Sequence, residues 1–151
     1  MRNIKILSLL CSLIACITTD QSYAAKVDTT EVFSTAMQKK IKTEPIIPDS
    51  YAGWINKSPN IALLADQYNI IIICPDGGYS SWYFDSPEEA NFRYETFVAN
   101  ELVSWTDENY RTIRKPKGRA ITGLSMGGHG GLFLGFKHQD IYGAAGSMSG
   151  G

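Results

Sequence analysis

The chain has 151 residues, of which 44% are hydrophobic and 19% are charged, and its formal net charge is −1. This length allows one domain at most, the apolar content excludes a disordered chain, and the near-neutral charge excludes the basic surface of a nucleic-acid-binding protein. The 14 glycines and the 11% of aromatic residues suit a domain with tight turns and a cleft lined by flat side chains.

The first 24 residues have the order of segments found in an export signal. Arg2 and Lys5 supply a positive start, and residues 4–17 form an apolar stretch that is shorter than the about 20 residues needed to span a membrane. Ser22-Tyr23-Ala24 has the small-x-small pattern of a cleavage site. We therefore expect residues 1–24 to be a signal peptide, residues 25–151 to be the folded domain, and the protein to be periplasmic or secreted.

A second interpretation of the same segment involves a lipid anchor. Leu13-Ile14-Ala15-Cys16 is similar to a lipobox, in which case the signal would end before Cys16 and that cysteine would carry lipid. The folded domain keeps only Cys74, which ends an apolar run and is interpreted as a small buried residue. No Cys and His residues have the spacing of metal ligands, so we expect no metal and no cofactor.

The elements expected in the first half are short. Residues 27–33 can form an edge strand, and residues 40–47 a second strand, which Pro45 restricts to an edge position or terminates. The spacing of apolar residues after Asn60 predicts a short helix through Tyr68.

The second half alternates strands and helices. Ile70 to Cys74 is a continuous apolar run, which is typical of a strand buried on both faces of a parallel sheet. An aromatic loop at residues 79–87 precedes a helix that starts at Tyr94 and includes Trp105. A second buried strand is expected at residues 120–122, then a glycine-dense turn with a helix to about residue 136, and a third strand near residues 144–148. This alternation predicts an α/β fold with a parallel sheet flanked by helices.

Gly123-Leu124-Ser125-Met126-Gly127 matches G-x-S-x-G between a predicted strand and a predicted helix. The chain must reverse there within a few residues, which would hold Ser125 in a strained conformation at the sheet's carboxyl edge. A side chain at Gly123 or Gly127 would collide with a neighbouring element, and Gly128, Gly130 and Gly131 would let the helix pack close to the sheet. The amide N–H of Met126 would then point at the same place, where an oxyanion could be stabilised with help from the helix dipole.

A serine nucleophile needs a base, and the expected domain has two histidines. His129 lies one turn into the same helix and is interpreted as a packing residue, while His138 is interpreted as a charge partner at the helix C-terminus. Asp76 follows a strand and is interpreted as a turn residue. These residues therefore provide a nucleophile and half of an oxyanion hole.

The segment from Trp54 to Gly151 resembles the esterase family of α/β-hydrolases that includes S-formylglutathione hydrolase (esterase D), tributyrin esterases, acetylxylan and feruloyl esterases and the mycolyltransferases. The resemblance is carried by several short stretches: residues 74–78 (CPDGG), 81–83 (SWY), 94–97 (YETF), 101–102 (EL), 119–131 (RAITGLSMGGHGG) and 143–150 (GAAGSMSG). It implies that Ser125 is the acylated nucleophile and that Met126 supplies one oxyanion amide. It also implies that Trp82 and Tyr83 lie in a loop that walls the substrate pocket.

Two departures from the family pattern affect the expected activity. In the family, an Asp and then a His follow the nucleophile at a distance, beyond the position of Gly151. The family also places a strand ending in His-Gly after the Pro-Asp-Ser-Tyr turn, where this chain runs from Tyr51 into Ala52. The resemblance therefore implies a partial α/β-hydrolase, truncated and internally deleted. It would lack the C-terminal strands and the strand that normally lies between those of residues 70–74 and 120–122.

Three functional hypotheses follow. The first is a serine carboxylesterase acting on acetyl or feruloyl esters of polysaccharides or on small acyl esters. The second is a remnant without catalytic activity, because the acid, the base and one oxyanion loop are missing. The third is a carbohydrate-binding surface built on Trp54, Trp82 and Tyr83.

Overall fold

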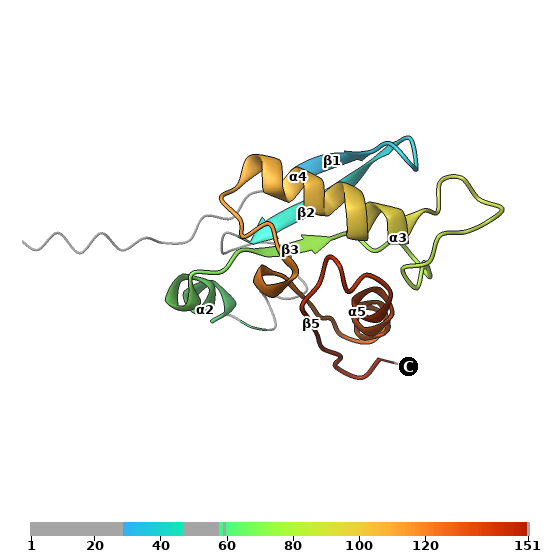
Figure 1. The fold of residues 1–151 in the computed structure, drawn as a ribbon. Helices are drawn as coiled ribbons and strands as arrows, with labels where there is room; N and C mark the ends of the chain where they lie inside the picture. The colour runs from blue at the N-terminus through green and yellow to red at the C-terminus, as the bar shows by residue number, and fades with distance from the viewer. Residues whose placement is uncertain (1–28, 47–57, 59, 151) are drawn as a thin grey trace, which may run out of the picture.

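The computed structural model describes residues 29–46, 58 and 60–150. The expected signal at residues 1–24, the alternative lipid site at Cys16 and the aromatic residue Trp54 lie outside this part of the chain. Among the described residues, no helix is both long enough and apolar enough to cross a membrane. The described part consists of two small sheets with helices around them (Figure 1).

Three strands form the first sheet, which is antiparallel and has the order β1-β2-β3. They are β1 (Thr30–Ser34), β2 (Lys39–Ile46) and β3 (Ile72–Pro75). In the hairpin of β1 and β2, Val32 lies opposite Ile41, and both side chains are buried. Because side chains alternate between the two faces of a strand, this register places Val32 and Ile41 on the same buried face, whereas Phe33 lies on the opposite face and is exposed.

Pro45 lies in β2, which is the middle strand of this sheet, so the expected edge position is wrong for the strand as a whole. The reason is that β1 is shorter than β2, and its pairing with β2 ends where Thr30 meets Thr43. Beyond that point β2 pairs only with β3, with Pro45 opposite Ile73. Proline lacks an N–H group, and it is accommodated where the strand has one hydrogen-bonding neighbour.

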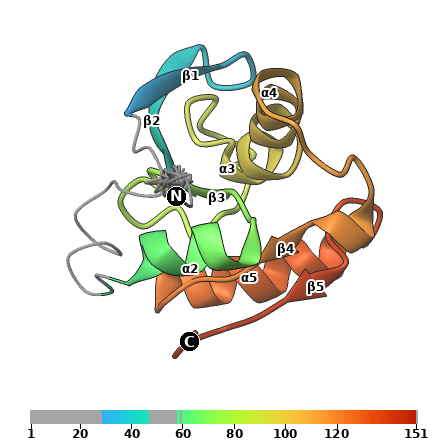
Figure 2. The same cartoon turned by 90° about the vertical axis from the view of Figure 1, so that its left-hand side faces the viewer.

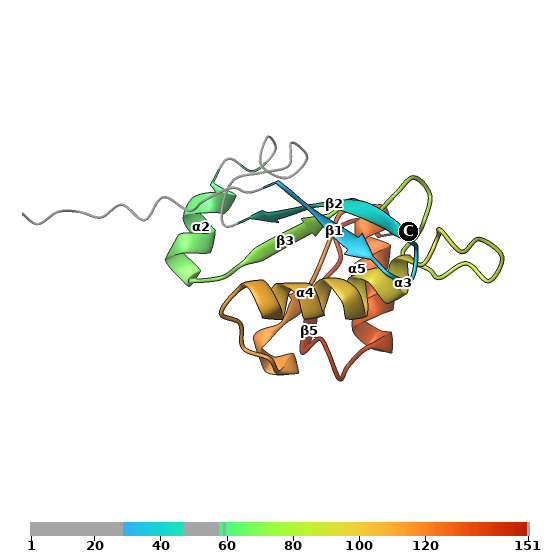
Figure 3. The same cartoon turned by 90° about the horizontal axis from the view of Figure 1, so that it is seen from above.

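A continuous helical segment lies alongside this sheet (Figure 3). It consists of α3 (Tyr94–Thr96), the π-helical turn η1 (Phe97–Glu101) and α4 (Leu102–Asn109). As the apolar spacing predicts, Phe97 and Leu102 are buried, in one core cluster with Val32 and Ile41. Glu101 fixes the β1–β2 turn, because its carboxylate accepts hydrogen bonds from Ser34 Oγ at 2.5 Å and from the Ala36 amide at 2.8 Å.

The second sheet has two parallel strands, β4 (Ala120–Ile121) and β5 (Ala144–Ala145), with α5 (Met126–Lys137) between them in sequence. The short 3-10 helix η2 (Pro116–Gly118) precedes β4. The parallel strand–helix–strand unit expected for residues 120–148 is therefore confirmed. A further single bridge between Leu124 and Met148 extends the pairing toward the turn that carries Ser125.

Side chains of the α3–η1–α4 segment connect the two sheets. Arg119, next to β4, donates a hydrogen bond to Asp107 of α4 at 2.5 Å, and both side chains are largely buried. Tyr142 Oη donates to the Val98 carbonyl at 3.0 Å. Figure 2 shows the result, with α4 on the side of β1 and β2, and α5 beside β4 and β5. The central helical segment therefore holds together two sheets that do not share a strand.

The sheet is interrupted between β3 and β4, since no described strand joins them. Ile70 is 51% exposed, and the residues of β3 are only half buried. Ala120, Ala144 and Ala145 are exposed. The expectation that residues 70–74 and 120–122 are fully buried strands is therefore wrong, because the described part of the chain contains no strand beside them on the sides that face the interruption. The interruption falls between the two strands that the family resemblance predicts to flank a missing strand.

Helix α2 (Ile61–Tyr68) forms where its apolar spacing predicts it. Its apolar face is nevertheless largely open to solvent: Leu63 is 67% exposed and Tyr68 is 65% exposed, and only Ala65 is buried. A helix normally covers its apolar stripe against a sheet. The apolar stripe of α2 is exposed because the sheet that it would cover is incomplete beside β3.

Candidate active site

Ser125 lies in the turn between β4 and α5 with φ 55° and ψ −120°. A non-glycine residue adopts such a conformation only when its surroundings impose it, and strained residues of this kind gather at active sites. Here the Ser125 amide donates a hydrogen bond to the Met148 carbonyl at 2.9 Å, and the Ser125 side chain is exposed. The strand–turn–helix context expected for the G-x-S-x-G motif is present.

The two glycines of the motif have different roles. A Cβ atom on Gly123 would overlap the backbone of Gly127, so Gly123 permits the tight reversal, as expected. A Cβ atom on Gly127 would meet only Tyr83 Oη, at an ordinary contact distance of 4.0 Å. The expectation that Gly127 avoids a collision is therefore wrong, because the nearest atom to that Cβ position is the end of the Tyr83 side chain and not the backbone of a strand.

Met126 is the first residue of α5, so its N–H group has no acceptor within the helix. The next turn is regular, with the His129 amide donating to the Ser125 carbonyl at 3.0 Å. The positive end of the helix dipole therefore lies beside the Ser125 side chain, together with a backbone donor. Such a helix N-terminus can stabilise a negatively charged oxygen.

Trp82 and Tyr83 are adjacent in the aromatic loop, and both have positive φ angles, 50° and 64°. The Trp82 ring is 42% exposed, and its centroid lies 5.3 Å from that of His129 in an edge-to-face arrangement. The Trp82 carbonyl accepts a hydrogen bond from His129 Nδ1 at 3.2 Å. Because a carbonyl oxygen only accepts, Nδ1 of His129 carries the proton. His129 therefore packs against this loop, as expected, and also ties the loop to α5.

Tyr83 points inward, between α5 and the turn that follows β3. A Cβ atom on Gly130 would overlap its ring, and one on Gly77 would lie 2.5 Å from its hydroxyl oxygen. Burial raises the pKa of the Tyr83 phenol, and the negative charge of Asp76 raises it further. Tyr83 is therefore a neutral side chain that fills an interior gap, and Trp82 is the more exposed of the two.

Sequence reasoning missed two further aromatic residues near the turn that carries Ser125. Phe84 and Phe133 flank His129, with ring centroids 5.2 Å and 6.0 Å from its ring. Together with Trp82 they form an aromatic cluster one helical turn beyond Ser125. The i, i+4 spacing of His129 and Phe133 on the helix was the signal that could have indicated this cluster.

The histidine–carboxylate pair in the described part lies at the other end of α5 from Ser125. His138 Nε2 and Glu95 Oε1 are 2.9 Å apart, and Lys137 shares the same carboxylate. At 1.5 Å per residue, the helix separates this pair from Ser125 by about 18 Å. His138 is thus a partner at the C-terminal end of the helix, as expected. Asp76 accepts a hydrogen bond from the Gly78 amide at 2.8 Å, which is the expected turn-forming role.

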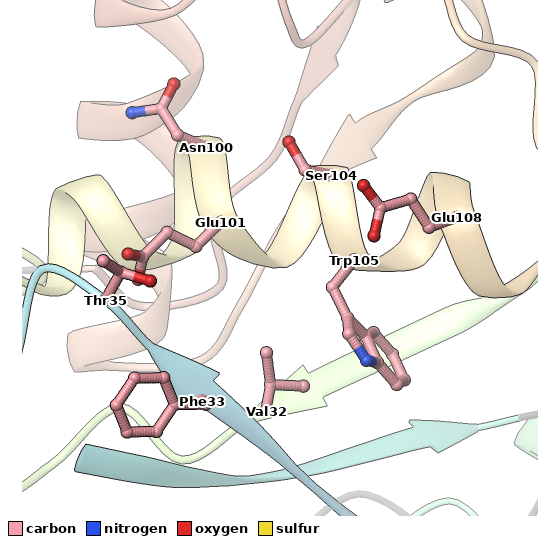
Figure 4. Close-up of a pocket in the computed structure, with 8 residues that line it drawn as sticks. All are labelled: Val32, Phe33, Thr35, Asn100, Glu101, Ser104, Trp105 and Glu108. Carbon is pink, nitrogen blue, oxygen red and sulfur yellow. The ribbon is translucent and has the colours of Figure 1, made fainter. Parts of the chain in front are cut away.

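A groove of about 430 Å³ lies away from Ser125, between β1 and the segment of η1 and α4 (Figure 4). Its lining includes Val32, Phe33, Trp105 and two carboxylates, those of Glu101 and Glu108. Glu101 already accepts the two hydrogen bonds of the β1–β2 turn, so this carboxylate has a structural role. Among the described residues, no three His, Cys, Asp or Glu side chains gather closely enough to hold a metal ion.

Comparison with known proteins identifies related sequences. The family model described as "Putative esterase" matches residues 62–151. An esterase of Mycobacterium tuberculosis is 40% identical over 85 residues, which cover 54% of this chain and 18% of that protein. The diacylglycerol acyltransferase/mycolyltransferase Ag85A of Mycobacterium bovis is 34% identical over 109 residues, which cover 68% of this chain and 31% of that protein. The chain thus spans less than a third of the length of these two relatives.

Solved structures of similar fold include MPT51 of Mycobacterium tuberculosis, with a TM-score of 0.72 and 26% identity over 84% of this chain and 52% of that one. A ferulic acid esterase matches with a TM-score of 0.61 and 25% identity over 78% of this chain and 55% of that one. The S-formylglutathione hydrolase of Agrobacterium tumefaciens, at 15% identity and a TM-score of 0.64, shares the fold. Both the sequence match and the fold lead to one conclusion: the chain is a partial α/β-hydrolase and belongs to this esterase family.

Proposed function

We propose that the protein is a serine carboxylesterase whose nucleophile is Ser125. The observation that carries this proposal is the conformation of Ser125, held at φ 55° at the start of α5 with an exposed side chain. The Met126 N–H group, which lacks a helical acceptor, is the proposed donor to the oxyanion. Membership of the esterase family supports the reaction class.

The proposed reaction is acyl transfer to water. Ser125 Oγ forms a bond to the ester carbonyl carbon and gives up its proton to a base. The carbonyl oxygen becomes an oxyanion, which accepts a hydrogen bond from the Met126 amide. Collapse of this intermediate breaks the bond to the alcohol, which leaves with a proton, and water then hydrolyses the acyl-serine in the same way.

Neither described histidine is placed as a base for Ser125. The family resemblance implies an Asp and a His that follow the nucleophile, whereas the described His138 pairs with Glu95 at the far end of α5. His129 is held by the Trp82 carbonyl. We therefore propose that the 151-residue chain by itself reacts slowly, at the roughly 10³–10⁴-fold acceleration over water that remains when a triad member is absent. The alternative function is a remnant without catalytic activity, and the positions of His129 and His138 are the observation that supports this alternative.

For the substrate, we propose acetyl or feruloyl esters of polysaccharides, or small acyl esters. The support is the loop of Trp82 and Tyr83 beside α5, together with the aromatic cluster that includes Phe84 and Phe133. One structural neighbour is named a ferulic acid esterase. We further propose export through residues 1–24, with a lipid on Cys16 as the alternative; the mass of the mature N-terminal peptide would distinguish these two.

Labelling with an organophosphonate tests the nucleophile. The probe should add to Ser125 of the exported protein, as located by peptide mass spectrometry, and Ser125→Ala should remove the label completely. Ser147→Ala is a matched control, since Ser147 lies just after β5 and has no proposed role in the chemistry. Labelling at another serine, or no labelling of the wild type, would reject Ser125 as the nucleophile.

A further inference from the structure

We propose that Tyr83 is a positioning residue for the nucleophile turn. Its ring would hold the first turn of α5, and with it Ser125 and the Met126 amide, against the turn that follows β3. This inference rests on the proposed function of Ser125 and gives Tyr83 a role different from that of a pocket wall.

The glycines of α5 form two rows that face different neighbours. Gly128 and Gly131 face the segment around β5: Cβ atoms there would lie 2.8 Å from the Met148 carbonyl oxygen and 2.7 Å from the Gly146 carbonyl oxygen. Gly130 and Gly127 face Tyr83 instead. The glycine pattern therefore leaves space on a second side of α5. The neighbour on that side is the Tyr83 side chain and not a strand.

The Tyr83 ring runs along this second row toward Ser125. A Cβ atom on Gly130 would overlap the ring atoms Cγ and Cδ2, which lie near the base of the side chain, whereas the Gly127 position is nearest to the hydroxyl oxygen, at 4.0 Å. Because Gly127 is one turn closer to the helix N-terminus, the hydroxyl points toward the end of α5 that carries Met126 and Ser125. The side chain is thus aligned with the part of the helix it would hold.

The opposite side of the Tyr83 hydroxyl contacts the turn after β3. A Cβ atom on Gly77 would lie 2.5 Å from this hydroxyl oxygen and 3.3 Å from Met126 Cε. The Gly77 backbone, the Tyr83 hydroxyl and the Met126 side chain therefore occupy one small volume. Since protein interiors are close-packed, loss of the ring would leave a gap into which Met126, and the amide it carries, could move.

The loop itself is fixed at several points, so Tyr83 is presented in a defined position. The positive φ angles of Trp82 and Tyr83 are accompanied by a hydrogen bond from the Tyr83 amide to Ser81 Oγ at 3.1 Å. Ser81 Oγ in turn donates to the Gly77 carbonyl. The Tyr83 hydroxyl is neutral at pH 7, since the pKa of a tyrosine is ordinarily about 10, so the side chain adds no negative charge next to a developing oxyanion.

The test measures the rate at which an organophosphonate labels Ser125 at increasing probe concentrations. Two constants are obtained: the maximal labelling rate, and the probe concentration at which the rate is half of that maximum. Tyr83→Leu should lower the maximal rate about tenfold to a hundredfold, since a misplacement of about 1 Å has effects of this size, and should leave the half-saturating concentration unchanged. Gly130→Ala, which displaces the ring from the other side, should have the same effect. Tyr83→Phe keeps the ring and should restore most of the rate. Tyr79→Leu is the matched control, because Tyr79 is 93% exposed in the same loop and its replacement should change nothing.

The possible outcomes separate this inference from the proposed function. Wild-type labelling rates in both Tyr83→Leu and Gly130→Ala would overturn it, and so would a change confined to the half-saturating concentration, which would identify Tyr83 as a pocket wall. If the wild type is not labelled at Ser125, the proposed function fails, and amide hydrogen exchange of residues 126–129 then decides the role of Tyr83. Faster exchange in Tyr83→Leu but not in Tyr83→Phe supports it, and equal exchange in all three proteins overturns it.

Discussion

The strain at Ser125 leads to a prediction about stability. At φ 55° and ψ −120°, the Cβ atom of Ser125 is in conflict with its own backbone, at a cost of about 1–3 kcal/mol. Glycine has no such conflict, but it gains about 0.5–1 kcal/mol of conformational freedom in the unfolded chain. We expect Ser125→Gly to be more stable than Ser125→Ala by about 1 kcal/mol or slightly more.

The comparison with alanine isolates the strain, because both variants lose the hydroxyl and only Ser125→Ala keeps the Cβ atom. A difference of about 1 kcal/mol shifts the midpoint of thermal unfolding by roughly 4 °C for a chain of this length, between the ranges for domains of 60–100 and of 150–250 residues. The midpoint can be followed by circular dichroism on the two purified variants. If Ser125→Gly unfolds at the same temperature as Ser125→Ala, or below it, Ser125 is not strained in solution and the nucleophile turn is not as described here.

Three further predictions concern a glycine of α5, the β1–β2 turn and the buried tyrosines. Gly128→Ala should destabilise the protein by about 1–3 kcal/mol by overpacking, because the added Cβ atom would lie within 2.9 Å of backbone atoms. Gly127→Ala should be nearly neutral, because its Cβ atom would make only an ordinary contact. Urea unfolding of both variants checks this difference. Glu101→Ala should cost about 1–3 kcal/mol, since two buried or partly buried donors of the β1–β2 turn lose their acceptor; equal urea midpoints for variant and wild type would contradict it. Burial raises the pKa of Tyr83 and of Tyr142. Above about pH 10 these two residues keep protons in the folded state that the unfolded chain releases. Their contribution to the free energy of unfolding should therefore be constant up to that pH and then fall. A Tyr142→Phe variant should show a smaller fall between pH 9 and pH 11, as measured by urea unfolding.

The candidate site is an arrangement that two regions far apart in sequence produce together. Ser125 and Met126 come from the turn before α5, while Tyr83 comes from the loop after β3. The contact between them passes through Gly77 and Gly130, because a Cβ atom at either position would overlap the Tyr83 side chain. For this reason the interruption of the sheet between β3 and β4 does not by itself separate the nucleophile turn from the aromatic loop.

The sequence by itself determined the order of the elements and the position of the tight turn that carries Ser125. The helix of residues 61–68, the strand–turn–helix around Ser125 and the role of Gly123 follow from local periodicity and from the close approach of residues four apart in the chain. These features depend on short-range geometry, which neighbouring residues specify.

Only the tertiary structure decided how the strands pair and where the side chains of the aromatic loop point. The apolar run at residues 70–74 predicted a doubly covered parallel strand, yet β3 pairs antiparallel with β2 and ends its sheet, because burial and pairing depend on strands far away in sequence. In the same way, nothing in adjacent Trp82 and Tyr83 shows that one ring lies at the surface and the other against Gly130. That choice is made by the packing of α5 against the turn after β3, a contact between segments about 50 residues apart, which local propensities do not encode.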